Sequence, residues 1–265
     1  MKKYACTVGI FDSGIGGLTV LKECLAVAPA CRYLYYGDNL RAPYGERSPE
    51  EILSFVREAL KKFKRRRVDA VVIACNTATA VAVDAVRREF SFPIIGMEPA
   101  VKPAAERGGN ILVLSTPRTA ESARMKMLTG RFPDCRFRVF PAPALAGAIE
   151  RCLTKGETLY LAAHLPEGKY DSVVLGCTHY VFYKKEIADF YAAKVFDGGA
   201  GTAKRLFEVI RNIDLGRADH LLSTKNPNNC FSFCEKNSVK FVGKCRKINK
   251  TVFLRTFVLE SDKIN

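Results

Sequence analysis

Two similar nine-residue segments decide the fold of this chain: DAVVIACNT at residues 69–77 and DSVVLGCTH at residues 171–179. Each copy reads as a short apolar, β-branched run that ends in a cysteine and two polar residues, as expected for a buried strand of a parallel sheet. The two cysteines, Cys75 and Cys177, lie 102 residues apart (177 − 75). The repeat indicates two equivalent strand ends, each carrying a thiol.

A second pair of segments repeats at nearly the same offset. The strand that ends at Asp12-Ser13 corresponds to the strand at 111–114 that ends at Ser115-Thr116, an offset of 103 residues (115 − 12). Two independent matches at one offset favour a duplicated domain over coincidence. In open parallel sheets, polar residues at the carboxyl ends of strands lie at the edge where ligands bind.

Strand-like and helix-like segments alternate on both sides of the first copy. We predict strands at 7–11, 32–36, 68–74 and 93–96, and helices at 18–27, 49–64 and 78–90. This alternation is typical of an α/β fold. We therefore expect two similar, pseudo-symmetric domains with mainly parallel sheets and an active site in the cleft between them. Residues 1–97 with 207–265 are assigned to the first domain, onto which the C-terminal segment packs back, and 98–206 to the second.

The composition is that of a soluble protein. Of the 265 residues 48% are hydrophobic and 26% charged, enough for a large buried core. The longest apolar candidate, residues 68–86, is interrupted by polar and acidic side chains, so we expect no membrane span. Residues 4–11 faintly resemble a secretion signal but run straight into Asp12-Ser13-Gly14, and we interpret them as a first strand of a cytoplasmic protein.

Ten cysteines in a chain without a secretion signal are expected to be reduced, most of them as small core residues. Cys230, Cys234 and Cys245 have a loosely zinc-like spacing, but no fourth ligand stands at a regular distance from them. We therefore predict no metal site.

The formal net charge of +15 raises the question of an anionic partner. One basic run occupies residues 61–67, and a second basic region begins at Lys225. A positive field attracts a dianionic substrate and also holds nucleic acid non-specifically. Because no nucleic-acid-binding motif accompanies the charge, we interpret it as a solvated basic face. A nucleic-acid-associated protein remains the alternative from a different functional class.

Two thiols on opposite sides of a cleft suit one kind of reaction. Inverting the Cα of an amino acid requires removing a proton from one face and delivering a proton to the other, which two acid/base groups do directly. A cysteine serves as the base when it is a thiolate and as the acid when it is a thiol, and its usual pKa of about 8.5 makes both forms reachable. Cys75 and Cys177 are therefore the predicted pair.

The polar residues beside these strand ends fit the same scheme. Asp12 and Ser13 precede the segment Gly14-Ile15-Gly16-Gly17, whose backbone N–H groups open a helix and are able to hold a carboxylate. Asp12 is predicted to pair with a substrate ammonium group or to influence Cys75. His179, two residues beyond Cys177, is predicted to assist that thiol.

The glycine segment also has a competing interpretation. Gly14-x-Gly16 after a strand, with Asp38 at the end of the next strand, resembles a dinucleotide-binding fingerprint. However, Thr19 occupies the third glycine position, and the carboxylate of Asp12 would repel a pyrophosphate. We regard this signal as weak.

Four sequence blocks together resemble the family of bacterial glutamate racemases, a resemblance that covers nearly the whole chain in family order. The blocks are Phe11-Asp12-Ser13-Gly14-Ile15-Gly16-Gly17-Leu18-Thr19-Val20, Pro43-Tyr44-Gly45, Ala74-Cys75-Asn76-Thr77-Ala78 and Gly176-Cys177-Thr178-His179-Tyr180. Related aspartate racemases share the two-cysteine plan, so an aspartate or other amino-acid racemase is the alternative activity.

The resemblance implies interconversion of L- and D-glutamate without pyridoxal phosphate or metal, supplying D-glutamate for peptidoglycan and thus for cell wall biogenesis and cell shape. It also implies a homodimer, and some relatives are thought to have a second role at DNA gyrase. By resemblance, the catalytic residues are Cys75, Cys177, Asp12, His179 and Glu150. The substrate-binding positions implied are Asp12, Ser13, Pro43, Tyr44, Gly45, Asn76, Thr77 and Thr178. The chain departs from the family at Val181, where proline is common, and in the basic, cysteine-rich tail from Lys225.

Overall fold

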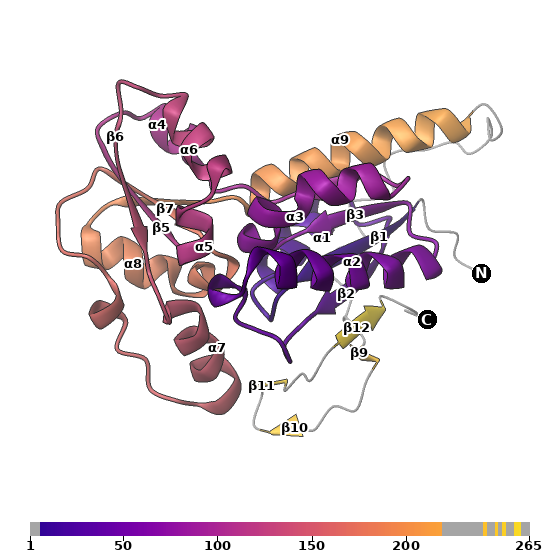
Figure 1. Cartoon of the computed structure of the whole chain (residues 1–265), viewed down its shortest axis with the longest axis horizontal. Helices are drawn as coiled ribbons and strands as arrows, with labels where there is room; N and C mark the ends of the chain where they lie inside the picture. Colours follow the sequence, from indigo (N-terminus) through magenta and orange to yellow (C-terminus); the bar gives the residue numbers. More distant parts are fainter. Residues whose placement is uncertain (1–5, 219–240, 243–246, 249–250, 253–256, 261–265) are drawn as a thin grey trace.

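The computed structural model describes residues 6–218 and four short strand segments at 241–242, 247–248, 251–252 and 257–260. Two α/β domains lie next to each other in Figure 1, joined at residues 96–101 and again at 197–199. The order of elements confirms the predicted α/β class, and each domain has its own sheet of parallel strands.

The first sheet has the strand order β4-β3-β1-β2, in which all four strands run parallel. Its strands are β1 (Thr7–Asp12), β2 (Arg32–Gly37), β3 (Ala70–Ile73) and β4 (Ile94–Gly96). Two strands from the end of the chain, β12 (Phe257–Glu260) and β9 (Phe241–Val242), extend this sheet antiparallel to β2. The helices of this domain are α1 (Leu18–Val27), α2 (Pro49–Arg65), α3 (Asn76–Glu89) and α9 (Gly199–Ala218), with the 3₁₀ turn η1 (Tyr44–Glu46).

The second sheet has the order β6-β5-β7-β8, again all parallel. Its strands are β5 (Asn110–Ser115), β6 (Arg136–Pro141), β7 (Ser172–Gly176) and β8 (Lys194–Asp197). Around it lie α4 (Val101–Ala105), α5 (Pro117–Ala120), α6 (Ala123–Gly130), α7 (Leu145–Lys155), α8 (Lys184–Tyr191), η2 (Leu161–His164) and η3 (Thr178–Tyr183). A separate antiparallel pair is formed by β10 (Lys247–Ile248) and β11 (Thr251–Val252).

The two sheets have the same topology. In each, the first strand of the copy is central, the second strand lies on one side of it, and the third and fourth strands lie on the other. The predicted equivalents therefore occupy the same places: β1 matches β5, and β3 matches β7. Since β1 and β3 are adjacent and parallel, their carboxyl ends lie at the same edge of the first sheet. The carboxyl ends of β5 and β7 share an edge of the second sheet for the same reason.

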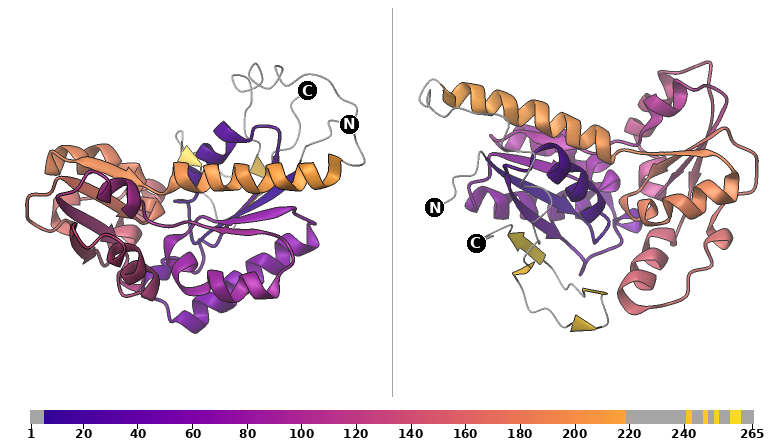
Figure 2. Two further views of the ribbon diagram at one scale, coloured as in Figure 1. Left: turned by 90° about the horizontal axis from the view of Figure 1, so that it is seen from above. Right: turned by 180° about the vertical axis from the view of Figure 1, so that it is seen from behind.

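Helices cover both faces of the first sheet, and Figure 2 shows α9 lying along this domain. Buried side chains of α1 and α9 share one core with β1, among them Val20, Ala203 and Leu206, while α2 and α3 pack on the opposite face. The proposed domain boundary between residues 206 and 207 falls inside the continuous helix α9. Since Ala203 and Leu206 already pack on the first sheet, we propose that the chain returns to the first domain at 197–199.

Local capping explains where the helices near the site begin. Ser48 and Glu51 form a reciprocal capping box at the start of α2, which has proline at its first position. The helix predicted at 78–90 begins two residues earlier, because Cys75 acts as N-cap and its Sγ accepts a hydrogen bond from the N–H of Ala78 at 3.4 Å. The catalytic candidate Cys75 is thus also the N-cap residue of α3.

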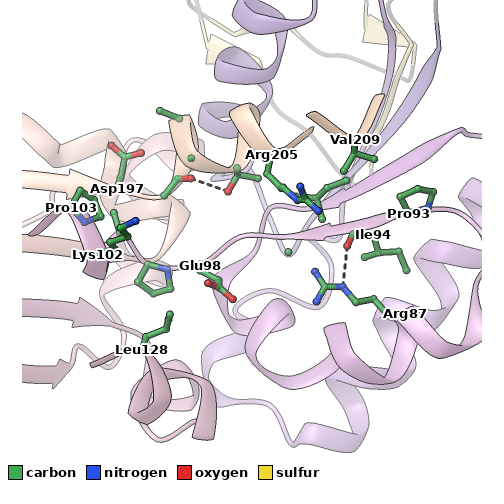
Figure 3. Close-up of a pocket in the computed structure, with 18 of the residues that line it drawn as sticks. Arg87, Pro93, Ile94, Glu98, Lys102, Pro103, Leu128, Asp197, Arg205 and Val209 are labelled. Atoms are coloured by element: carbon green, nitrogen blue, oxygen red, sulfur yellow. Dashed lines mark hydrogen bonds between the residues drawn. The ribbon is translucent and has the colours of Figure 1, made fainter. Parts of the chain in front are cut away.

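A cavity of about 1100 Å³ lies where the two connections cross between the domains (Figure 3). Residues from β4 and the segment after it, including Ile94 and Glu98, line one part, and residues from β8 and α9, including Asp197 and Arg205, line another. At its rim, Arg87 Nε donates to the carbonyl oxygen of Ile94 at 3.1 Å. The space therefore lies beside the two connections between the domains, not at the strand ends that carry the two thiols.

In the part of the chain that the structure describes, no helix is long and apolar enough to cross a lipid bilayer. Among the same residues, no three His, Cys, Asp or Glu side chains are grouped so that they could bind a metal ion. Cys230, Cys234 and Cys245, with the zinc-like spacing, lie outside the described residues, as does Lys225.

Candidate active site

A cavity of about 550 Å³ opens between the carboxyl ends of the two sheets. It is lined by side chains from both domains, so the predicted cleft exists. All the residues singled out from the sequence line it except Asp12. They are Ser13, Pro43, Tyr44, Gly45, Cys75, Asn76, Thr77, Glu150, Cys177, Thr178 and His179.

Cys75 forms one wall of this cavity, at the end of β3 and the start of α3. The residue is only 5% exposed, and its Sγ lies 3.5 Å from Ser13 Oγ. Burial raises the pKa of the Cys75 thiol to about 12, and the negative charge of Asp12 adds to the effect, while the Ser13 hydroxyl and the Ala78 N–H oppose it. Cys75 is therefore a thiol at neutral pH, the form that donates a proton.

The raised pKa predicts an unusual pH dependence for alkylation of Cys75. Only thiolate reacts with iodoacetamide, so the rate should rise about tenfold per pH unit from pH 7 to pH 10, whereas an ordinary thiol with a pKa of about 8.5 levels off near pH 9.5. Peptide mass spectrometry of the quenched protein measures the rate, with circular dichroism to confirm that the fold persists at each pH. A plateau below pH 9.5 would contradict the assignment.

The same pKa has a consequence for stability. The folded protein holds the Cys75 proton more tightly than the unfolded chain does, so this thiol stabilises the fold below about pH 9. That contribution is lost as the pH rises toward 12.

Cys177 lines the cavity from the second domain, at the end of β7. Its Sγ lies 3.9 Å from Nδ1 of His179, and Nε2 of His179 makes a short hydrogen bond with a carboxylate oxygen of Glu150 on α7. Burial lowers the pKa of His179, but the contacts with Cys177 and Glu150 more than offset it, so the pKa stands well above its usual value. A protonated imidazole therefore lies between a carboxylate and the second thiol, where it attracts negative charge on sulfur.

Asp12 lies beneath the cavity, and its side chain is fully buried. One carboxylate oxygen accepts a hydrogen bond from the N–H of Gly14 at 2.9 Å, and the other accepts from the hydroxyl of Thr178 at 3.3 Å. Burial raises the pKa of Asp12, against the opposing effects of His179 and two backbone N–H groups. With both oxygens engaged by the protein, Asp12 joins the first domain to Thr178 of the second, rather than facing the space a substrate would fill.

The side-chain amide of Asn76 lines the cavity and makes no hydrogen bond to the residues that the structure describes. The residue is 2% exposed, and neither its side-chain oxygen nor its nitrogen has a hydrogen-bond partner within the described residues. Buried polar groups without partners are rare and costly, and a functional role is one explanation for them. Asn76 is the first residue of the 14-residue helix α3, whose leading N–H groups also favour an anion.

The segment Pro43-Tyr44-Gly45 closes the cavity from the first domain. The hydroxyl of Tyr44 donates to a carboxylate oxygen of Asp38 at 2.6 Å, which fixes the segment to the end of β2. A side chain at Gly45 would place its Cβ 2.9 Å from the Cβ of Thr116, so glycine allows this segment to approach the second domain closely. Asp38, suggested above as part of a nucleotide fingerprint, instead anchors the cavity wall.

Three threonine hydroxyls join the domains at the cavity edge. Thr77 Oγ1 lies 2.9 Å from Thr116 Oγ1 and 3.3 Å from Thr119 Oγ1. Thr116 lines the cavity but was not among the predicted site residues. The repeat contained the signal for it, because the offset of 103 that relates Ser115 to Asp12 also relates Thr116 to Ser13.

Helix α7 lines the cavity with the predicted Glu150 and with several residues that the sequence did not reveal. Gly147, Glu150, Arg151, Thr154 and Lys155 line the cavity from successive turns of one helix face. Arg151 and Lys155 add two positive charges at this wall, of which Arg151 pairs with Glu157 at 2.9 Å. These charges, with a protonated His179, make the cavity suited to an anion.

The arrangement supports proton transfer at a carbon atom. One thiol stands on each side of the cavity, and they are close enough for charge on Cys177 to raise the pKa of Cys75. A buried amide, hydroxyl groups and a helix N-terminus surround the space between them. Such a site can hold a small carboxylate while one sulfur removes a proton and the other supplies one.

Comparison with known proteins agrees with this geometry. Residues 17–206 match the family model described as Asp/Glu/Hydantoin racemase. A glutamate racemase of Clostridium botulinum (strain Okra) is 36% identical over 223 residues, which is 80% of this chain and 87% of the relative.

Solved structures of glutamate racemases are similar to most of the chain, among them two complexes with glutamate. One is Escherichia coli glutamate racemase in complex with L-glutamate and the activator UDP-MurNAc-Ala, with a TM-score of 0.71 and 32% identity over 78% of this chain and 82% of that one. The other is Francisella tularensis glutamate racemase in complex with D-glutamate, with a TM-score of 0.68 and 27% identity over 86% of each chain. With two thiols in one cleft, a shared fold and a family match over most of its length, this chain belongs to the Asp/Glu/Hydantoin racemase family.

Proposed function

We propose that the protein is a glutamate racemase that interconverts L- and D-glutamate without pyridoxal phosphate or a metal ion. The observation that carries the proposal is the pair Cys75 and Cys177, one at the end of the equivalent strand of each domain, facing a single cavity. The relatives named above support the choice of substrate, because all three are glutamate racemases. The Escherichia coli structure holds L-glutamate and the Francisella tularensis structure holds D-glutamate.

In the proposed reaction, Cys177 as thiolate removes the Cα proton of L-glutamate, and Cys75 as thiol delivers a proton to the opposite face. The reverse reaction begins with D-glutamate and uses Cys75 as the base. Two features support this division: the high pKa that keeps Cys75 protonated, and the protonated His179 beside Cys177. Glu150 and Asp12 act through neighbours, Glu150 by holding His179 and Asp12 by holding Thr178.

We propose that one substrate carboxylate is held by polar groups of α3 that face the cavity. The Asn76 amide and the first N–H groups of α3 are suited to one carboxylate. Ser13, Thr77, Thr178 and the Pro43-Tyr44-Gly45 segment complete the proposed binding set.

The proposal extends to the cellular role, in which a cytoplasmic enzyme supplies D-glutamate for peptidoglycan. We also propose a homodimer, to be tested by the mass of the purified protein in solution.

The direct test is incubation of the purified protein with L-glutamate in deuterium oxide. D-glutamate carrying deuterium at Cα is the expected product, detected by chiral chromatography with mass spectrometry. The same assay with L-aspartate decides between the two substrates, and a higher kcat/KM for aspartate would overturn the choice of glutamate. Absence of any deuterium at Cα of either amino acid would refute racemase activity on both.

Replacing Arg151 with glutamine is expected to raise KM for glutamate about three- to tenfold and to leave kcat within twofold. The substrate is a dianion, and Arg151 contributes long-range attraction at the cavity wall without reaching the reacting carbon. Steady-state kinetics at low and at physiological salt measure the effect, which should shrink as salt rises. Arg57→Gln is the matched control, because Arg57 is also a half-exposed arginine paired with a glutamate, Glu89, but lies outside the cavity.

A further inference from the structure

Two cysteines that play no part in the cleft lie opposite each other at the other end of the first sheet. Cys6 immediately precedes β1, and Cys31 immediately precedes β2. These strands pair in parallel with Thr7 opposite Arg32, and the N–H of Arg32 donates to the carbonyl oxygen of Cys6 at 2.8 Å. The register therefore continues one residue outward and sets Cys6 beside Cys31.

The two sulfur atoms lie 2.6 Å apart. Even carbon atoms, which are smaller, keep about 3.5–4.0 Å between them when they are not bonded. Adjacent strands stand about 4.8 Å apart, which falls within the Cα separation of about 4.4–6.8 Å that a disulfide requires. The spacing of adjacent strands thus permits a cross-link between these two residues.

The pair lies in the buried core of the first domain. Cys6 and Cys31 are each 4% exposed and belong to the core shared by α1 and α9. A third cysteine of that core, Cys24, is fully buried, and burial raises its pKa to about 12. Cys24 is consequently a poor nucleophile for exchange and serves as an internal comparison.

We propose that Cys6 and Cys31 form a reversible intramolecular disulfide that closes the β1–α1–β2 unit. The oxidant is a low-molecular-weight disulfide such as oxidised glutathione. The thiolate of one cysteine attacks this disulfide and releases one small thiol. The second cysteine, as thiolate, then attacks the mixed disulfide and releases the other, so that two protein thiols are oxidised and one small disulfide is reduced to two thiols.

The cross-link would span 25 positions of the chain and enclose the loop that carries Asp12 and Ser13. Closing a loop of this length restricts the unfolded chain and raises the melting temperature. The linked residues lie at the amino ends of the strands, whereas the cavity lies at their carboxyl ends. Oxidation is therefore expected to raise the melting temperature and to leave the rate of racemisation unchanged. The disulfide and the proposed racemase activity are thus tested by different measurements.

The experiment equilibrates the purified full chain with oxidised glutathione, then blocks free thiols with N-ethylmaleimide and digests without reduction. Trypsin releases Cys6 within residues 4–22, and Cys24 and Cys31 together within residues 23–32. The expected product is these two peptides joined, with N-ethylmaleimide on Cys24 and a mass two hydrogen atoms below the sum of the peptides and that label. Fragment ions assign the bond to Cys31. The melting temperature should rise by about 5–10 °C and return after treatment with dithiothreitol.

Variants make the assignment specific. Cys6→Ser and Cys31→Ser should each abolish the joined peptide, whereas Cys24→Ala should retain it. Complete labelling of both Cys6 and Cys31 after oxidation, or a bond from Cys6 to Cys24, would overturn the proposal. The peptide analysis of the unmodified chain decides the matter even where a serine variant does not fold.

Discussion

Replacing Cys177 with alanine is expected to lower kcat/KM for racemisation of glutamate by about 10³- to 10⁴-fold, in both directions. The variant keeps the cavity and its binding groups but loses the acid/base group on one side, and such a group contributes about 10²–10⁴ in rate. Cys75→Ala should have an equally large effect, because inversion requires a proton to leave one face and another to arrive at the opposite face. Circular dichroism of the amino acid follows racemisation from either enantiomer.

The matched control is Cys135→Ala, which removes a half-buried thiol of the second domain that does not line the cavity. Its activity should stay within twofold of the unmodified protein. If either Cys75→Ala or Cys177→Ala retains more than a tenth of the activity, the two-thiol mechanism is wrong. Wild-type racemisation of glutamate in the same assay shows whether the proposed substrate is right, independently of the mechanism.

Gly16→Ala is expected to lower kcat/KM by about a hundredfold without unfolding the protein. A Cβ at this position would clash with the hydroxyl of Thr178 and would lie 2.8 Å from Nδ1 of His179. Either the glycine segment or the start of η3 must move, and a displacement of about 1 Å at a catalytic group can cost a hundredfold in rate. The added methyl group therefore acts on Cys177 through its neighbours.

Gly130→Ala is the control for this substitution, because a Cβ at Gly130, the last residue of α6, meets nothing within 4 Å. Melting temperatures of both variants separate loss of the fold from loss of site geometry. Unchanged activity in Gly16→Ala would mean that the contact between the glycine segment and η3 does not position His179.

The repeat around Cys75 and Cys177 was sufficient to predict the architecture. Its two copies occupy matching strands of two sheets with one strand order, because strand patterns and their polar ends are local properties of the sequence. Asn76 and Thr178, next to those strand ends, were named as binding residues by family resemblance, and both line the cavity.

Properties that depend on contacts between distant segments were not predictable from the pattern. The sequence could not show that both carboxylate oxygens of Asp12 are occupied by protein groups, one of them from the other domain. Glu150 entered only by family resemblance, since nothing in its own helix indicates that it meets His179. Arg151 looks like an ordinary surface charge until α7 is placed against the cavity.

The two thiols have different surroundings, and this difference has a kinetic consequence. In the proposed reaction, each conversion of L- to D-glutamate leaves the proton on the other sulfur, so the emptied protein is prepared for D-glutamate and not for a second L-glutamate. Cys177 faces a protonated histidine while Cys75 faces the buried carboxylate of Asp12, so the two empty forms differ in free energy. After each turnover the empty protein must return to its starting protonation state by exchanging protons with water. At saturating substrate, this step of the free protein contributes to the observed rate.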